Sequence, residues 1–164
     1  MFMAAINLGE FFGRVLDLQR MVGELFDRLA GRLEGHPEIA ALIRGLAEEE
    51  RQNLDMVGRF RDSLSEKLLA GLCDEAAVRQ LDRAAVLLED DPLGRFTDFE
   101  EAYDFIHELE NNQLLPLLRL LDHECRTERL DCTPIMMIVE QHLTRLDAVA
   151  AAAGDRLRRR AIRI

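Results

Sequence analysis

Apolar residues recur every three or four positions along long segments of this chain, the spacing that lines one face of an α-helix. The first segment covers about Leu8–Glu34. The second begins at Pro37, and its apolar spacing is lost near Gly71. A third follows Thr97, and a fourth covers Thr133–Gly154. The pattern predicts an all-α protein built on four long helices.

Short links and prolines indicate how these helices begin and connect. The link Gly35-His36-Pro37 is so short that the first two helices are expected to run antiparallel. Thr97-Asp98-Phe99-Glu100 is a capping-box pattern for the third helix, and Thr133-Pro134 gives the fourth a cap and a first-turn proline. Pro116 lies inside the third helix and is expected to kink it, because its ring clashes with the carbonyl of Asn112.

The segment between the second and third helices, about Gly71–Phe96, is long enough to cross the length of a bundle. Asp74 is expected to cap a shorter helix that ends at Leu88, before the turn Asp90-Asp91-Pro92-Leu93-Gly94. After this crossover the third helix runs parallel to the second. The predicted fold is therefore an up-down-down-up four-helix bundle over residues 1–154, followed by a basic tail at residues 155–164.

Composition and charge narrow the class of protein. Of the 164 residues, 48% are hydrophobic and 32% are charged, which is typical of a soluble helical domain. The net charge of −10 repels nucleic acid, so no nucleic-acid partner is expected. No stretch approaches the roughly 18 apolar residues of a membrane span, and residues 1–7 lack a signal-peptide pattern. We therefore expect a cytoplasmic protein without a transmembrane segment.

Two features leave alternatives open. Cys73, Cys125 and Cys132 are odd in number and lack CxxC spacing, so reduced thiols are expected, with a redox pair or soft-metal site at Cys125 and Cys132 as the alternative.

The C-terminal tail carries five arginines between Arg156 and Arg163. This tail could bind an acidic partner, or it could lie against the protein's own acidic surface.

Polar residues interrupt the apolar face of each long helix. They are Gln19 on the first, Glu50 and Asn53 on the second, Glu110 on the third and His142 on the fourth. A carboxylate that faces a core without compensation costs several kcal/mol. Helical bundles resolve this cost with a metal cluster or with a closed hydrogen-bond network. The sequence therefore predicts a buried polar site at these positions.

The two halves of the chain share one plan, a long helix, a connection and a second long helix, each with polar core residues. The stretch Asn7–Val57, and within it LAEEERQN at residues 46–53, resembles the rubrerythrin-like branch of the ferritin-like superfamily. Residues 98–124 and 138–146 match more loosely. The resemblance implies a ferritin-like bundle with a di-iron site built from two lone Glu residues and two Glu-x-x-His pairs. No CxxC pairs of a rubredoxin domain are present.

The resemblance assigns the family's ligands to six positions of this chain. The lone glutamates fall on Gln19 and Glu110, the first Glu-x-x-His pair on Glu50 and Asn53, and the second on Val139 and His142. Three of the six expected ligands remain, and they are Glu50, Glu110 and His142. One imidazole and two carboxylates fit a single metal ion better than a pair.

Two hypotheses of function follow. In the first, the chain holds no metal, its polar core is a hydrogen-bond network, and it is a non-catalytic binding or assembly module. In the second, it is an iron-binding oxidoreductase of the peroxidase or ferroxidase type, or an iron-handling protein, with one iron or a rearranged pair. A shifted register would instead bring Asp17, Glu24, Glu49, Glu108 or Glu140 inward, and Glu24 and Glu140 are interpreted as solvated. A homodimer through apolar helix faces is also considered, with Phe11, Phe12 and Phe60 in the contact.

Overall fold

The computed structural model describes residues 6–89, 91–127, 129 and 131–157. Helices make up most of this part of the chain, and the β-structure within it is an isolated bridge between Asn7 and Leu72. The all-α prediction is confirmed. The elements are α1 (Leu8–Arg32), α2 (Pro37–Ser63), α3 (Glu66–Leu69), α4 (Glu75–Leu88), η1 (Pro92–Arg95), α5 (Phe99–Glu108), η2 (Leu109–Leu114), α6 (Leu115–Thr127) and α7 (Thr133–Leu157).

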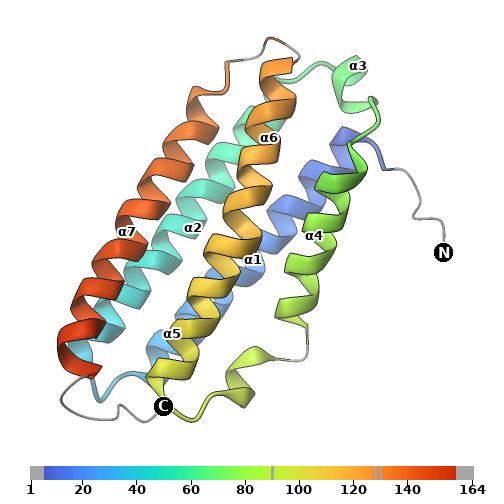
Figure 1. Ribbon diagram of the computed structural model, residues 1–164. Coiled ribbons are helices and arrows are strands. Elements are labelled where there is room, and N and C mark those ends of the chain that lie inside the picture. The colour runs from blue at the N-terminus through green and yellow to red at the C-terminus, as the bar shows by residue number, and fades with distance from the viewer. Residues whose placement is uncertain (1–5, 90, 128, 130, 158–164) are drawn as a thin grey trace.

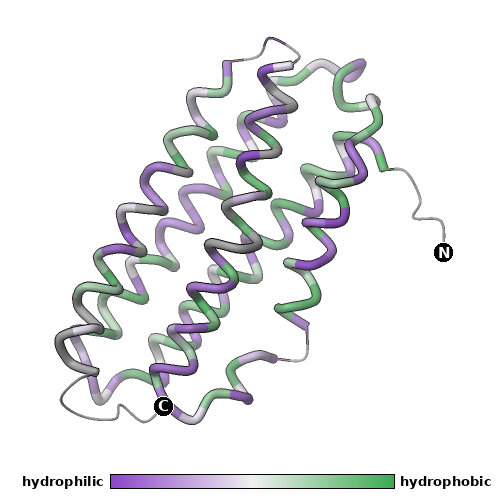
Figure 2. The backbone as a smooth tube through the Cα atoms, viewed as in Figure 1, coloured by the Kyte–Doolittle hydropathy of each residue, from purple (hydrophilic) through white to green (hydrophobic). Residues whose placement is uncertain are grey.

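The helices lie side by side along one long axis. In the view of Figure 1, α2 and the continuous segment α5–η2–α6 run upward, whereas α1, α4 and α7 run downward. Helix α2 packs against both α1 and α7, and α6 packs against α7. Figure 2 shows hydrophobic and hydrophilic residues alternating at helical spacing along the long helices. Each long helix therefore turns an apolar face toward its neighbours and a polar face toward solvent.

Helices α1 and α2 follow the sequence closely. Asn7 caps α1, because its side chain accepts from the amide of Glu10 at 2.8 Å and its own amide donates to the Glu10 carboxylate at 3.1 Å. The α1 helix ends at Arg32 rather than Glu34. The second helix, predicted to extend to about Gly71, ends at Ser63, and the short helix α3 follows it.

The apolar face of α1 forms much of the hydrophobic core. Its buried apolar members are Phe11, Phe12, Val15, Leu18, Val22, Leu25, Phe26, Leu29 and Ala30. Phe12 also contacts Phe60 of α2, with 6.0 Å between the ring centroids. The suggestion that Phe11, Phe12 and Phe60 contribute to a dimer contact is wrong, because all three are buried within this chain.

The crossover carries the predicted helix. Asp74 caps α4 and accepts from the amides of Ala76 and Ala77 at 2.7 and 3.3 Å, and the helix ends at Leu88 as predicted. Arg14 pairs with Asp82 on α4, and Arg28 pairs with Asp91 at 2.6 Å. These two ion pairs connect the crossover to α1.

Replacing Asp74 with alanine is expected to lower the free energy of unfolding by about 1 kcal/mol, because two amides of the first turn of α4 lose their acceptor. Urea denaturation monitored by circular dichroism measures this change. Asp55→Ala, at an exposed position inside α2, is the matched control and is expected to leave the midpoint nearly unchanged. A midpoint for Asp74→Ala equal to that of the control would contradict the capping role.

The third long helix departs from the prediction at two places. Its N-cap is Asp98, which accepts from the amide of Glu101 at 3.0 Å, so the cap lies one residue later than the Thr97 pattern suggests. Glu101 in turn accepts from the amide and hydroxyl of Thr97 at 2.7 and 2.9 Å. A turn of π-helix, Leu109–Leu114, widens this helix and ends two residues before Pro116.

Helix α7 begins at Thr133, where the Asp131 carboxylate accepts from the amide and hydroxyl of Thr133 at 3.0 and 2.6 Å. The helix continues through Gly154 to Leu157, beyond the predicted end. The arginines of the tail from Arg158 onward lie outside the described residues. Among the helices of the described ranges, none has the length and apolar character that a membrane crossing requires.

Candidate metal centre

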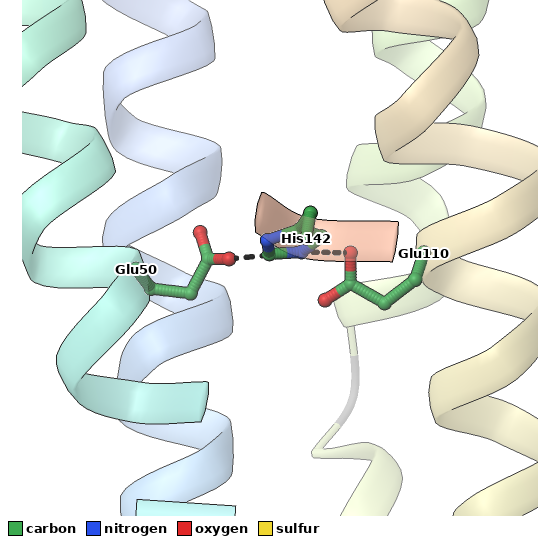
Figure 3. Close-up of side chains that lie close together, drawn as sticks. All are labelled: Glu50, Glu110 and His142. Carbon is green, nitrogen blue, oxygen red and sulfur yellow. Dashed lines mark hydrogen bonds and ion pairs between the residues drawn. The ribbon is translucent and has the colours of Figure 1, made fainter. Parts of the chain in front are cut away.

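Three of the predicted site residues meet in the core. Glu50 comes from α2, Glu110 from the π-turn η2 and His142 from α7, and Figure 3 shows the imidazole lying between the two carboxylates. His142 Nε2 is 2.5 Å from Glu110 Oε2 and 3.2 Å from Glu50 Oε1. One possible ligand atom from each residue lies within 4.8 Å of the others. We call these three residues the core cluster, and its geometry could hold a metal ion.

The core cluster is buried almost completely. The exposed fractions are 2% for Glu50, 0% for Glu110 and 3% for His142. Water therefore cannot screen the charges of these side chains, so each charge needs a partner close by. The π-turn that carries Glu110 matters for this geometry, because it adds a residue to the turn and shifts the register that a regular helix would give.

The two amide residues at the predicted site lie beside the core cluster. Gln19 of α1 and Asn53 of α2 are buried, and both line a cavity of about 10 Å³ with Glu50, His142 and apolar side chains. This volume is close to the smallest that holds one water molecule or a small ion. The side chain of Val139, which stands at another ligand-equivalent position, lies outside the described residues. The structure thus brings together five of the predicted polar residues.

Hydrogen bonding leaves several polar atoms at this site unsatisfied. Among the described residues, Gln19 Oε1, Glu50 Oε1, Glu110 Oε1 and His142 Nδ1 have no hydrogen-bond partner. Glu50 Oε1 does lie at ion-pair distance from His142, but the contact lacks the direction of a hydrogen bond. Three of these four atoms are acceptor oxygens. A bound cation or a donating water would satisfy them.

The charges of the core cluster shift its proton affinities. Burial and, after it, the negative charge of Glu110 raise the pKa of Glu50 to about 8, against an opposing effect of His142. Burial alone would lower the pKa of His142, but the carboxylates of Glu110 and Glu50 outweigh it and raise this pKa to about 9. Near pH 7 the cluster therefore keeps a proton on Glu50 and a second on His142.

A further buried carboxylate adjoins the core cluster. Glu49 of α2 is 8% exposed, and its Oε1 accepts from Arg145 Nε of α7 at 2.5 Å. A shifted register would make Glu49 a metal ligand, but its partner in the structure is Arg145. Glu49 follows Leu46 by three residues, and that spacing indicates its place at the edge of the buried face. The other carboxylates considered in that register, Asp17, Glu24, Glu108 and Glu140, are exposed.

The residues present do not fit a pair of iron ions. A di-iron site needs bridging carboxylates and an imidazole for each metal, whereas the core cluster offers one imidazole. Gln19 and Asn53 could add neutral carbonyl oxygens but no charge. One divalent cation could be held by the core cluster, because two carboxylates balance its charge and one ligand atom from each of the three residues lies within 4.8 Å of the others.

The two cysteines whose side chains are described, Cys73 and Cys132, are not among the residues of the core cluster. Cys73 is half-buried, and Cys132 is buried with its thiol 3.7 Å from the backbone carbonyl of Asp122. The side chain of Cys125 lies outside the described residues, so a pairing between Cys125 and Cys132 stays an untested alternative.

No protein-family model matches the chain, and comparison with curated proteins and with solved structures also gives no match. The resemblance to rubrerythrin-like proteins therefore stays a prediction from the sequence.

Proposed function

We propose that this chain is a metal-binding protein that holds one divalent cation in the core cluster, inside a ferritin-like four-helix bundle. The observation that carries the proposal is the convergence of Glu50, Glu110 and His142, from three separate helical elements, on one buried point with unsatisfied acceptor oxygens. A structural network of this size would normally pair such atoms with one another. A cation at this point would be within reach of one ligand atom from each of the three residues.

The arrangement of the helices supports the ferritin-like part of the proposal. A short link joins α1 to α2, and the crossover that contains α4 separates α2 from the segment α5–η2–α6. Ferritin-like bundles have one such long crossover, and their metal ligands project inward from facing helices. The position of the core cluster between α2, η2 and α7 supports the comparison with such a site.

The donor atoms favour a particular class of metal. Imidazole nitrogen suits iron, zinc and related transition metals, whereas carboxylate oxygen suits harder cations such as manganese. The mixed set of one nitrogen and two carboxylates points to Fe(II), Mn(II) or Zn(II). Because Gln19 and Asn53 stand where the family resemblance expects charged or imidazole ligands, we propose binding of the ion and not di-iron oxygen chemistry.

A second candidate function is a metal-free binding or assembly module. It is favoured by the direct contact of 2.5 Å between His142 and Glu110, since a charged imidazole at that distance compensates the carboxylate without any ion. The two candidates differ in one measurable property, which is whether the folded chain binds a divalent cation with the core cluster.

Calorimetric titration with Mn(II) and Zn(II) tests the proposal. Glu110→Gln keeps the size of the side chain but removes its charge, and we expect affinity to fall at least about 100-fold. Glu108→Gln, an exposed position two residues away, is the matched control and is expected to bind like the unsubstituted protein. Equal affinities for the two variants would place the ion elsewhere and refute the proposed site.

A further inference from the structure

A groove on the surface reaches the residues of the buried site. It lies between α1 and α2, has a volume of about 250 Å³ and is lined at its base by Gln19 and Glu50. The same two residues also line the buried cavity beside His142. Gln19 and Glu50 are therefore shared by a space open to solvent and by the space inside the core.

The wall of this α1–α2 groove contains a glycine that the backbone does not require. Gly23 lies within α1, and no described glycine has the positive φ that favours this residue. A Cβ atom at Gly23 would lie 3.4 Å from Glu50 Cβ, an ordinary contact. Glycine weakens a helix relative to alanine, so its effect here is to leave space beside Glu50.

An ion pair crosses the groove. Arg51 of α2 contacts Asp27 of α1 at 2.5 Å and Glu48 at 2.7 Å, and its side chain is about half exposed. Exposed ion pairs contribute little to stability, so this one can open at small cost. Behind it, Gln19 Oε1 and Glu50 Oε1 are buried acceptors without hydrogen-bond partners among the described residues. Acceptor oxygens of this kind receive a cation and repel an anion.

We infer that the α1–α2 groove is the route by which a divalent cation reaches the core cluster, with the Arg51–Asp27 ion pair at its mouth and Gln19 as the first buried ligand that the ion meets. This inference rests on the proposed function. It adds that the rate of loading is set by Gly23 and Arg51, which do not belong to the core cluster.

Stopped-flow loading with Co(II), followed by its absorption bands, tests the route. Gly23→Leu fills the groove and is expected to slow loading at least about tenfold while equilibrium affinity stays within about threefold, because the ligands are unchanged. Gly31→Leu is the control on the same helix, where a side chain meets open space.

Arg51→Ala is expected to speed loading relative to Arg44→Ala, an exposed control on α2.

Equal loading rates for Gly23→Leu and Gly31→Leu would overturn the route while leaving the proposed function intact. If Gly23→Leu does not fold, Gly23→Ala provides a smaller obstruction with the same expected direction. If the unsubstituted protein binds no Co(II), the proposed function fails, and the groove is tested by thiol labelling instead. Gln19→Cys is then expected to react with a small cationic methanethiosulfonate faster than Val22→Cys in the core, and equal reactivity would overturn the inference.

Discussion

Replacing His142 with leucine is expected to lower the free energy of unfolding by about 3–5 kcal/mol at pH 8, which is the usual cost of breaking a buried ion pair by removing one partner. The imidazole lies 2.5 Å from Glu110 and 3.2 Å from Glu50, so both carboxylates lose the positive charge they face. Leucine fills most of the volume of the imidazole side chain. The decrease in the free energy of unfolding therefore reflects the lost charge more than lost packing. Urea denaturation of the metal-free protein measures the change.

The dependence of this loss on pH separates charge from packing. Burial and the charge of Glu110 raise the pKa of Glu50 to about 8, so at pH 5 Glu50 is neutral and the imidazole has one carboxylate fewer to compensate. We therefore expect a smaller loss of stability at pH 5 than at pH 8. His123→Leu, at an exposed position on α6, is the control and is expected to change little at either pH. The same loss for His142→Leu at both values would show that packing, not charge, dominates.

The affinity of the core cluster for Mn(II) is expected to increase with pH, by about 100-fold per pH unit up to pH 8, because the ion must displace two protons. Burial and the charge of Glu110 raise the pKa of Glu50 to about 8, while Glu110 and Glu50 raise that of His142 to about 9 against the effect of burial. Both groups bind the metal only when deprotonated. The dependence should weaken to about tenfold per unit between pH 8 and 9 and vanish above pH 9.

Glu50→Gln provides the matched control for this pH dependence. The amide cannot take up a proton, so only the proton of His142 must be displaced, and the slope should fall to about tenfold per pH unit. This slope should end below pH 9, because Glu50 no longer helps to raise the pKa of His142. Calorimetry in two buffers of different ionisation enthalpy counts the released protons directly. An unchanged slope in Glu50→Gln would contradict the protonation of Glu50 that its burial predicts.

Much of the buried site could be predicted from the sequence, because helical spacing fixes which residues share a face. Gln19, Glu50, Asn53, Glu110 and His142 each interrupt an apolar face, and all five are buried. A residue that follows the helical repeat of its apolar neighbours must point where they point, whatever its polarity. Helix packing then brings these faces together.

The contacts within the site could not be predicted in the same way. The π-turn at Leu109–Leu114 shifts the register around Glu110, and a pattern with a period of 3.6 residues does not reveal it. The pairing of Glu49 with Arg145 joins α2 to α7 and depends on how these helices are rotated against each other. The predicted N-cap of α5 is wrong by one residue, because Thr97 and Asp98 are both favourable N-cap residues and tertiary structure selects between them.

The most direct test of the central claim is the number of metal ions bound per folded chain, measured by elemental analysis after anaerobic loading with Fe(II) and removal of excess metal. We predict one ion per chain, and none in a variant that combines Glu50→Gln, Glu110→Gln and His142→Leu. No bound ion in the well-folded unsubstituted protein would contradict the proposal and leave the metal-free module. Two ions per chain would contradict it in the other direction and indicate a di-iron site that the core cluster alone cannot provide.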